Sequence, residues 1–347
     1  MNNGLVVQES VCLRELNTLR VGVTARFYTK VRTLGQLRQA LTWARERNLE
    51  TLVLGGGSNL VFAEDVNALV IHLAIVGRCW RDVQDSQATL VLGAGENWHE
   101  AVLYASGAGY RGIENLALIP GTAGAAPVQN IGAYGVELSD TLLSVTALDT
   151  ETLEPVVLAS NQCDFAYRDS LFKRQPGRYI ILEIALLLSR SRPLALGYGD
   201  LKQYFSGRQV SRSLTPADVA QGVMAIRRRK LPDPAQLPNA GSFFKNPVVT
   251  DQTWERLNRD YPEMVAYPAD HSVKLAAAWL IDQCGWKGYR NGKVGVHNRQ
   301  ALVLVNHGDG SGRDILALAR RIRADVEERF GITLEMEPRV VPASLGL

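Results

Sequence analysis

The segment "NAGSFFKNP", residues 239–247, places one serine hydroxyl among small, aromatic and amide side chains, with a lysine three positions later. The nucleophilic serine of many hydrolases lies in a Gly-x-Ser-x-Gly turn beside a base, and "GSFFK" does not form that pattern. The segment alone does not decide the role of Ser242: if this serine acts in the chemistry, donating a proton is the alternative to attacking a substrate.

Two short glycine turns could bring main-chain N–H groups close to a phosphate. They are "GGGSN", residues 55–59, and "GAG", residues 93–95. Neither completes Gly-x-Gly-x-x-Gly, because Leu60 and Trp98 occupy the third glycine position, and no P-loop lysine follows either turn. Each turn alone is typical of an ordinary tight turn. Together with the Gly-, Ala- and Pro-rich residues 112–137, they predict a large phosphate-bearing cofactor.

Three groups of charged residues each allow a structural and a functional interpretation. "RRRK", residues 227–230, suits a solvated helix end, where cations complement the helix dipole, but it also suits a phosphate ligand. Arg168 stands beside Asp169, which favours a surface ion pair, although a carboxylate-binding arginine would look the same. "EMEPR" offers Glu335 and Glu337 on one face of a strand, and the residues alone do not choose between them.

The elements that must position these residues alternate between helical and extended patterns. Hydrophobic spacing and turn residues predict helices over residues 33–49, 215–230, 272–284 and 314–330, and strands over 142–158 (with a turn at 149–152), 178–189, 301–306 and 332–341. Thr215, Pro216 and Asp218 form a capping-box pattern at the start of one helix. Residues 112–137 are too rich in glycine and proline for a long helix and too apolar for a linker. We expect them to form a packed, buried loop.

Composition narrows the function classes. The chain has 347 residues, 46% hydrophobic and 21% charged, which is typical of a soluble protein with two or three subdomains. A net charge of +3 is too small to argue for nucleic acid or an anionic membrane. Four scattered cysteines and five histidines show no ligand spacing, so no metal site is expected. The first residues lack a signal-peptide pattern and no run is long enough to span a membrane, so a cytoplasmic protein is expected.

Eight motifs occur in one order along almost the whole chain: "GGGSN", "GAGENW", "GIENLALIPGTAGAAPVQNIGAYGVE", "YRDSLFK", "KLPDP", "NAGSFFKNP", "SVKLAAAWLID" and "LEMEPR". This series resembles the UDP-N-acetylenolpyruvoylglucosamine reductase family, also called the MurB family. The tyrosines in "LGYGDL" and "VAYPADHSVK" resemble those of its longer subtype, which close over the substrate.

The resemblance implies an α+β flavoenzyme with three subdomains and a vanillyl-alcohol-oxidase-like FAD-binding module instead of a Rossmann fold. Residues 1–75 and 76–228 would form the two FAD-binding subdomains, and residues 229–347 the UDP-sugar domain, with the last strand returning to the active site. By this likeness NADPH reduces a noncovalently held FAD. The reduced flavin then reduces UDP-N-acetylglucosamine enolpyruvate to UDP-N-acetylmuramate for peptidoglycan synthesis. A monomer is expected.

The resemblance also implies roles for individual residues. Ser242 matches the proton donor, Arg168 the arginine that binds the substrate carboxylate, and Glu337 the glutamate at the same centre, although proline comes later in this segment than in the family pattern. Lys230 matches the lysine that neutralises the UDP diphosphate. Further substrate contacts match Tyr167, Tyr198, Asn246, Tyr267 and Gln300.

The expected FAD contacts are Gly55, Gly56, Gly57, Ser58, Asn59, Gly121, Thr122, Gly124, Ala125, Ala126, Asn130, Gly132 and Gly135. Ala125 and Ala126 stand where some family members have serines, so main-chain N–H groups would bind the pyrophosphate there. Two other functions remain open: an FAD oxidase of the same fold, and a nucleotide-sugar sensor without catalysis. A sensor would have no need of Ser242, Arg168 and Glu337 together.

Overall fold

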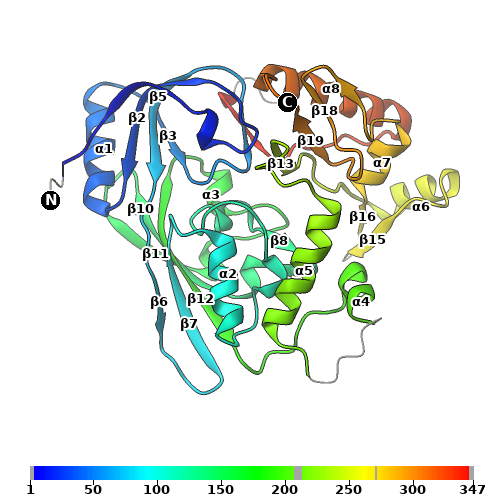
Figure 1. Ribbon diagram of the computed structural model, residues 1–347, viewed down its shortest axis with the longest axis horizontal. Coiled ribbons are helices and arrows are strands. Elements are labelled where there is room, and N and C mark those ends of the chain that lie inside the picture. Colours follow the sequence, from blue (N-terminus) through cyan, green and yellow to red (C-terminus); the bar gives the residue numbers. More distant parts are fainter. Residues whose placement is uncertain (1–3, 207–212, 270–271, 344–347) are drawn as a thin grey trace. The chain divides into compact units, whose positions relative to one another are not determined.

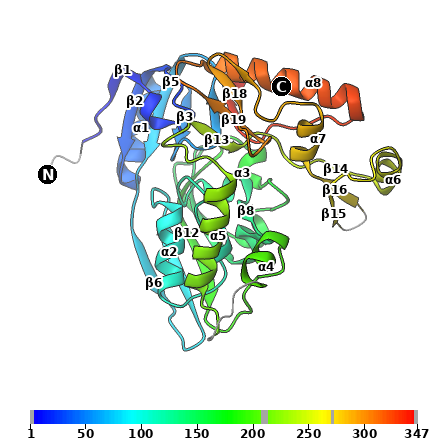
Figure 2. The same ribbon diagram turned by 45° about the vertical axis from the view of Figure 1, so that its right-hand side comes forward.

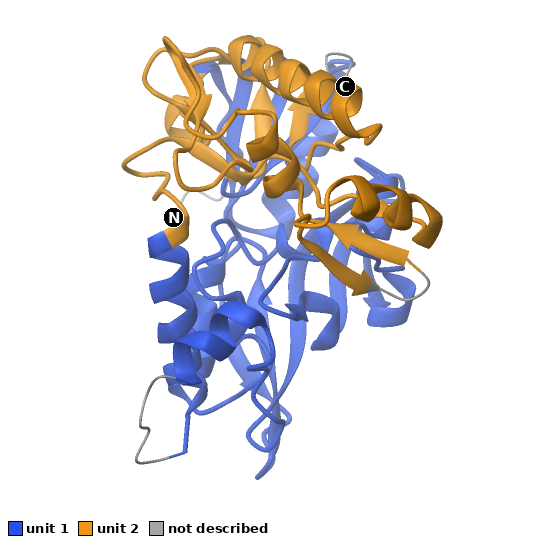
Figure 3. Ribbon diagram, turned by 90° about the vertical axis from the view of Figure 1, so that its right-hand side faces the viewer, with its two compact units in different colours: residues 1–11, 25–56, 67–229 blue, residues 12–24, 57–66, 230–347 orange. Residues whose placement is uncertain are grey.

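The computed structural model describes residues 4–206, 213–269 and 272–343. The chain divides into two compact units, which are coloured separately in Figure 3. Unit 1 contains residues 1–11, 25–56 and 67–229, and unit 2 contains residues 12–24, 57–66 and 230–347. Each unit is therefore assembled from three separate stretches of sequence.

Unit 1 is built on two sheets. The first has the order β1 (Gln8–Cys12), β2 (Thr24–Val31), β5 (Val66–Leu73) and β3 (Thr51–Leu54). The second has the order β11 (Pro155–Ala159), β10 (Leu142–Asp149), β12 (Tyr179–Ser189), β7 (Gln87–Gly93) and β6 (Arg78–Arg81). Strands β3 and β5 are parallel, whereas the neighbours in the second sheet are antiparallel. The predicted hairpin over residues 142–158 and the strand over 178–189 are confirmed as β10, β11 and β12.

Helices of unit 1 close its core over these sheets. They are α1 (Leu34–Glu46), α2 (Trp98–Gly107), α3 (Leu171–Arg174), α4 (Gly199–Ser206) and α5 (Pro216–Lys230), whose last residue belongs to unit 2. One apolar cluster joins the buried faces of α1, α2 and α5 to β5, β7, β10 and β12. Helices α2 and α5 lie side by side (Figure 1). The predicted cap of α5 is confirmed, since the Thr215 N–H donates to Asp218 at 2.8 Å and the Asp218 N–H donates to Thr215 Oγ1 at 3.2 Å.

Residues 112–137 form the packed loop that their composition predicts. Their short elements are η2 (Glu114–Leu116), η3 (Ala126–Gln129), β8 (Gly132–Ala133) and β9 (Val136–Glu137). All three residues of η2 are buried, including the carboxyl group of Glu114. Burial raises the pKa of that carboxyl group, while the N–H of Gly112 donates to it at 2.6 Å.

Unit 2 contains a sheet with the order β13 (Asn239–Ser242), β19 (Val303–Asn306), β18 (Val294–Val296) and β17 (Arg290–Asn291). Helices α7 (Ala277–Gln283) and α8 (Gly312–Phe330) pack together, and α8 also packs along β18 and β19 (Figure 2). A smaller sheet has the order β14 (Val248–Val249), β16 (Ser272–Leu275) and β15 (Ala266–Ala269), beside helix α6 (Asp251–Asp260). Strand β20 (Arg339–Val341) pairs in parallel with β4 (Leu60–Phe62).

Two predicted elements of unit 2 are wrong in part. The helix predicted over residues 272–284 begins only at Ala277, because Ser272–Leu275 pairs with β14 and β15 as strand β16. The strand predicted over residues 332–341 is reduced to β20 and one bridge between Met336 and Phe244. Pro338 lies between them and lacks the N–H that a continuous ladder needs.

Candidate active site

Three glycine-rich turns come together within unit 1. A Cβ atom added to Gly56 would lie 2.9 Å from Gly121 Cα, and one added to Gly124 would lie 2.5 Å from Ala94 Cβ. The Gly124 N–H donates to Ala94 O at 2.9 Å, and the Ala123 N–H donates to Glu96 O at 2.8 Å. Any side chain at these glycines would push the turns apart.

Because the three turns lie close together, they fit the interpretation in which they act jointly, and not the one in which each is an unrelated tight turn. Glycines leave the main chain uncovered by side chains, so that a ligand such as the diphosphate of a dinucleotide can approach it closely. Gly57, Ser58 and Asn59 belong to the stretch of unit 2 that follows. There the Asn59 Nδ2 group donates to Glu337 O at 3.4 Å, and the Arg339 N–H donates to Asn59 O at 3.0 Å.

Arg168 is held by the loop of residues 112–137. Its side chain is 16% exposed, Nη2 donates to Gly132 O at 2.7 Å, and Nη1 lies 3.8 Å from Glu137 Oε1. Asn130, with a φ of 45°, donates from Nδ2 to Glu137 Oε2 at 2.8 Å. The guanidinium also lies 5.1 Å from the ring centre of Tyr167. Arg168 is therefore fixed from several sides before any ligand arrives.

The ion pair considered between Arg168 and Asp169 is not formed, because Asp169 pairs with Arg174. Glu137, which the sequence analysis did not single out, takes the place beside Arg168. Nothing in the local sequence marks it, since the contact depends on how the glycine-rich loop folds back. Asn130 and Gly132 contact this network, whereas their expected contact with a cofactor stays a prediction.

Ser242 lies in unit 2 at the end of β13, opposite Val303 of β19. The next residue, Phe243, is fully buried, its N–H donates to Leu302 O at 2.7 Å, and its carbonyl accepts from the Glu337 N–H at 2.9 Å. The main chain that carries Ser242 is thus bonded on both sides. The same bond brings the backbone of Glu337 next to the Ser242 position.

The structure distinguishes the two glutamates that the sequence left open. Glu335 has an exposed side chain and forms an ion pair with Lys245. Glu337 is half-buried, and its backbone is bonded to Phe243 and Asn59. The Glu337 backbone thus lies next to Ser242, whereas the predicted role of Glu337 as the functional carboxylate stays a prediction.

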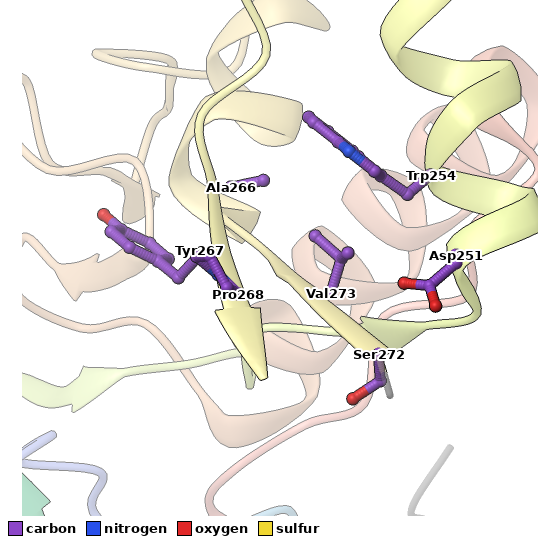
Figure 4. A pocket seen from close by; sticks show the side chains of 7 residues that line it. All are labelled: Asp251, Trp254, Ala266, Tyr267, Pro268, Ser272 and Val273. Atoms are coloured by element: carbon purple, nitrogen blue, oxygen red, sulfur yellow. The ribbon is translucent and has the colours of Figure 1, made fainter. Parts of the chain in front are cut away.

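The other expected substrate contacts in unit 2 lie on separate elements. Asn246 Oδ1 accepts the Ala277 N–H at 3.0 Å and so caps α7, while Gln300 Oε1 accepts the Leu302 N–H at 3.3 Å. Lys230 is the last residue of α5. Tyr267 lies on β15 and borders a pocket of about 390 Å³. Its phenol lies on the side of β15 opposite Trp254 (Figure 4).

The remaining substrate tyrosine, Tyr198, lies in unit 1, where its ring meets the ring of Tyr134 edge-on with centres 5.4 Å apart. Burial raises the pKa of the Tyr134 phenol, so this phenol stays neutral at ordinary pH. The 112–137 loop therefore contributes contacts to both Arg168 and Tyr198.

Comparisons with known proteins match both parts of the chain. The family model described as "UDP-N-acetylenolpyruvoylglucosamine reductase, C-terminal domain" matches residues 233–341, and the one described as "FAD binding domain" matches residues 25–152. The UDP-N-acetylenolpyruvoylglucosamine reductase of Pseudomonas putida is 52% identical over 336 residues, which cover 96% of this chain and 98% of the relative. The chain belongs to the UDP-N-acetylenolpyruvoylglucosamine reductase family.

Further relatives agree with this assignment. The reductase of Alcanivorax borkumensis is 48% identical, with 95% of each chain covered. The crystal structure of the family member from Thermus caldophilus superposes with a TM-score of 0.68 at 27% identity, and covers 97% of this chain and 99% of its own. Like other members of the UDP-N-acetylenolpyruvoylglucosamine reductase family, the protein is an FAD-dependent oxidoreductase, and its predicted α+β class, distinct from a Rossmann fold, is confirmed.

Two negative findings apply to the described parts of the chain. Within residues 4–206, 213–269 and 272–343, no group of three or more His, Cys, Asp or Glu side chains is placed to hold a metal ion. None of the helices in those residues is both long and apolar enough to cross a membrane.

Proposed function

We propose that the protein reduces UDP-N-acetylglucosamine enolpyruvate to UDP-N-acetylmuramate in the cytoplasm, as a step of peptidoglycan precursor synthesis, and that it acts as a monomer. The observation that carries the proposal is the 52% identity to a UDP-N-acetylenolpyruvoylglucosamine reductase over 96% of the chain. The match to the FAD-binding family and the three converging glycine turns support a noncovalent FAD. When bound, FAD would take a hydride from NADPH and supply one to the enolpyruvyl double bond.

The two family matches also support the domain assignment. Residues 1–75 and 76–228 would bind FAD, and residues 229–347 would bind the UDP-sugar. Gly55, Gly56, Gly121, Thr122, Gly124, Ala125 and Ala126 would contact the cofactor, with Gly57, Ser58, Asn59, Asn130, Gly132 and Gly135 as further contacts. Ala125 and Ala126 carry no hydroxyl groups, and their N–H groups donate to Thr122 O at 3.0 Å and Ala123 O at 3.3 Å, so other N–H groups of the converging turns would bind the pyrophosphate.

Ser242 would donate a proton to the substrate carbon that becomes negatively charged. A serine hydroxyl is a weak acid, but a carbanionic carbon is a strong base. A proton donor held in a fixed position also avoids the entropy cost of bringing the donor and the carbon together. The two main-chain bonds of Phe243 give Ser242 that fixed position. Glu337, whose backbone lies next to Ser242, would act at the same carbon.

Arg168 would bind the substrate carboxylate and stabilise the enolate that spreads into it, because a guanidinium is always charged and binds two oxygens at once. Its fixed position, bonded to Gly132 O at 2.7 Å, means that little reorganisation is needed. Lys230 would neutralise the diphosphate. Tyr167, Tyr198, Tyr267, Gln300 and the Nδ2 group of Asn246 would complete the substrate contacts.

Anaerobic absorption spectra test this proposal. The flavin bands of the purified protein should bleach with NADPH and return when UDP-N-acetylglucosamine enolpyruvate is added. A protein that bleaches but stays reduced until air is admitted would be an oxidase. A protein that binds the UDP-sugar without flavin turnover would be a sensor.

A further inference from the structure

Asn115 joins two distant loop segments of unit 1 through one amide group. Its Nδ2 donates to Tyr134 O at 2.9 Å and to Ala195 O at 2.8 Å. The side chain is 1% exposed, so both bonds are shielded from water and from competition by it. The amide therefore fixes the distance between the turn at Tyr134 and the segment that leads to Tyr198.

The other end of the Asn115 amide lacks such bonds. Its Oδ1 is buried and has no hydrogen-bond partner among the residues that the structure describes. The other four buried asparagines that the structure describes, Asn17, Asn130, Asn239 and Asn306, each use Oδ1 as well as Nδ2. An asparagine present only for stability would be expected to satisfy both ends, because a buried acceptor without a donor is unfavourable. The two donor bonds therefore explain why an amide stands at position 115.

These bonds lead directly to Tyr198. Ala195 precedes Tyr198 by three residues, and the carbonyl of Tyr198 accepts the Lys202 N–H at 2.8 Å, which is the first turn of α4. Tyr134, the second acceptor residue, meets the Tyr198 ring edge-on at 79°. Asn115 thus bonds to the backbone of Tyr134 and to the backbone segment that leads to Tyr198.

We propose that Asn115 is a positioning residue for substrate binding, which sets the tyrosine pair Tyr134–Tyr198 in the geometry that receives the UDP-sugar. The inference rests on the proposed function, in which Tyr198 contacts the substrate. Asn115 itself touches no substrate. It acts by limiting the conformations of residues 195–198 before the substrate binds, so that less order has to be gained on binding.

A double-mutant cycle separates this role from a general effect on stability. The variants are Asn115→Leu, which keeps the branched shape of the side chain and removes both N–H donors, Tyr198→Ala, and the two combined. The measurement is the substrate concentration that half-saturates reoxidation of the NADPH-reduced flavin in stopped flow. Each single variant should raise it about tenfold, and the double variant should not exceed the larger single effect, since both remove one network.

The flavin content of the purified proteins serves as the internal control and should match that of the parent in all three variants. Asn306→Leu is the matched control, because Asn306 makes the same kind of bonds, to Leu19 O and Gly310 O, but in unit 2. The fold-changes in half-saturating substrate concentration caused by Asn306→Leu and by Tyr198→Ala should multiply when the two variants are combined. If the effects of Asn115→Leu and Tyr198→Ala also multiply, the inference is wrong.

Other outcomes are equally informative. If Tyr198→Ala leaves half-saturation unchanged, the substrate role of Tyr198 is wrong, and this inference falls with it while flavin turnover can still support the enzyme assignment. If Asn115→Leu does not retain flavin, the isosteric Asn115→Asp takes its place in the same cycle. Loss of flavin in both variants would show that the amide is required for the fold, which also overturns the inference.

Discussion

The Ser242 hydroxyl is carried by a main chain that Leu302 and Glu337 hold on both sides of Phe243. Ser242→Ala should therefore remove the hydroxyl without moving the strand. We expect flavin reduction by NADPH to stay nearly unchanged and reoxidation by the enolpyruvyl substrate to slow by about 10²–10⁴-fold, the usual contribution of a positioned acid. Stopped-flow traces of the two half-reactions would show this. An equal loss in both would reassign Ser242 to binding or folding.

The two glutamates near the C-terminus offer a matched pair of variants. Glu337→Gln should lower substrate reduction by about 10²-fold or more, because the Glu337 backbone lies beside Ser242, the proposed proton donor. Glu335→Gln should change turnover little and stability by no more than about 1 kcal/mol, because the Glu335 side chain of its ion pair with Lys245 is 67% exposed. Steady-state kinetics of both variants test whether Glu337 is the functional carboxylate. A larger loss of turnover in Glu335→Gln than in Glu337→Gln would refute this assignment.

A side chain at position 132 would enter space that the Arg168 guanidinium occupies. A Cβ atom there would lie 3.0 Å from Arg168 Nη1 and 3.0 Å from Glu137 Cγ. Gly132→Ala should displace the guanidinium and raise the substrate KM about tenfold, or about 1.4 kcal/mol. The control is Gly107→Ala, since a Cβ at Gly107 meets no atom within 4 Å. Equal KM values for Gly132→Ala and the parent would show that Arg168 does not depend on this contact.

At the scale of elements, α8 begins with a capping box. Ser311 Oγ accepts the Asp314 N–H at 3.2 Å, and Asp314 Oδ2 accepts the Ser311 N–H at 2.9 Å. The bonds from the Ser311 backbone and hydroxyl lower the pKa of Asp314. Ser311→Ala should lower the free energy of unfolding by about 1 kcal/mol near pH 7. Urea unfolding measures this change.

The loss of unfolding free energy caused by Ser311→Ala should become smaller as the pH falls. An acid whose pKa is lowered by folding stabilises the protein above its unfolded pKa, and this stabilisation is lost as pH falls through the folded value. The difference between Ser311→Ala and the parent should therefore shrink at about pH 3, below the ordinary aspartate pKa. Asp314→Asn removes the titration and serves as the control. A constant difference across pH would mean that Asp314 does not contribute through its charge.

The sequence predicted elements well where local signals decide them. The Thr215–Asp218 cap, the β10–β11 hairpin and the buried loop of residues 112–137 all depend on nearby residues. The predictions from sequence were wrong where pairing between residues far apart in the chain determines the structure. Residues 272–275 have a helical pattern but pair as β16, and Pro338 interrupts the last strand. For the same reason Glu137 and Asn115 were not predicted as parts of the site, since their partners lie far away in the sequence or depend on loop geometry.

At the scale of the whole molecule, unit 2 cannot be cut out as one continuous piece. Residues 230–347 lack β4, which pairs with β20, and they lack Leu19 and Thr18, whose carbonyls accept from Asn306 and Asn239. A fragment of residues 230–347 should therefore show no cooperative unfolding in urea. Mixing it with a fragment of residues 1–229 should restore cooperativity. Cooperative unfolding of residues 230–347 alone would contradict this expectation.

The pairing of β4 with β20 also has a consequence during synthesis. Val61 and Phe62 are fully buried in the finished protein, and their register partners are Val340 and Val341. A ribosome that adds about 5–20 residues per second needs roughly 15–55 s between making the first strand and the second. Throughout that time an apolar segment of the nascent chain stands without its partner. Exposed apolar surface and unpaired strand edges promote aggregation, so β4 is expected to be an aggregation-prone segment of the nascent chain until β20 has been made.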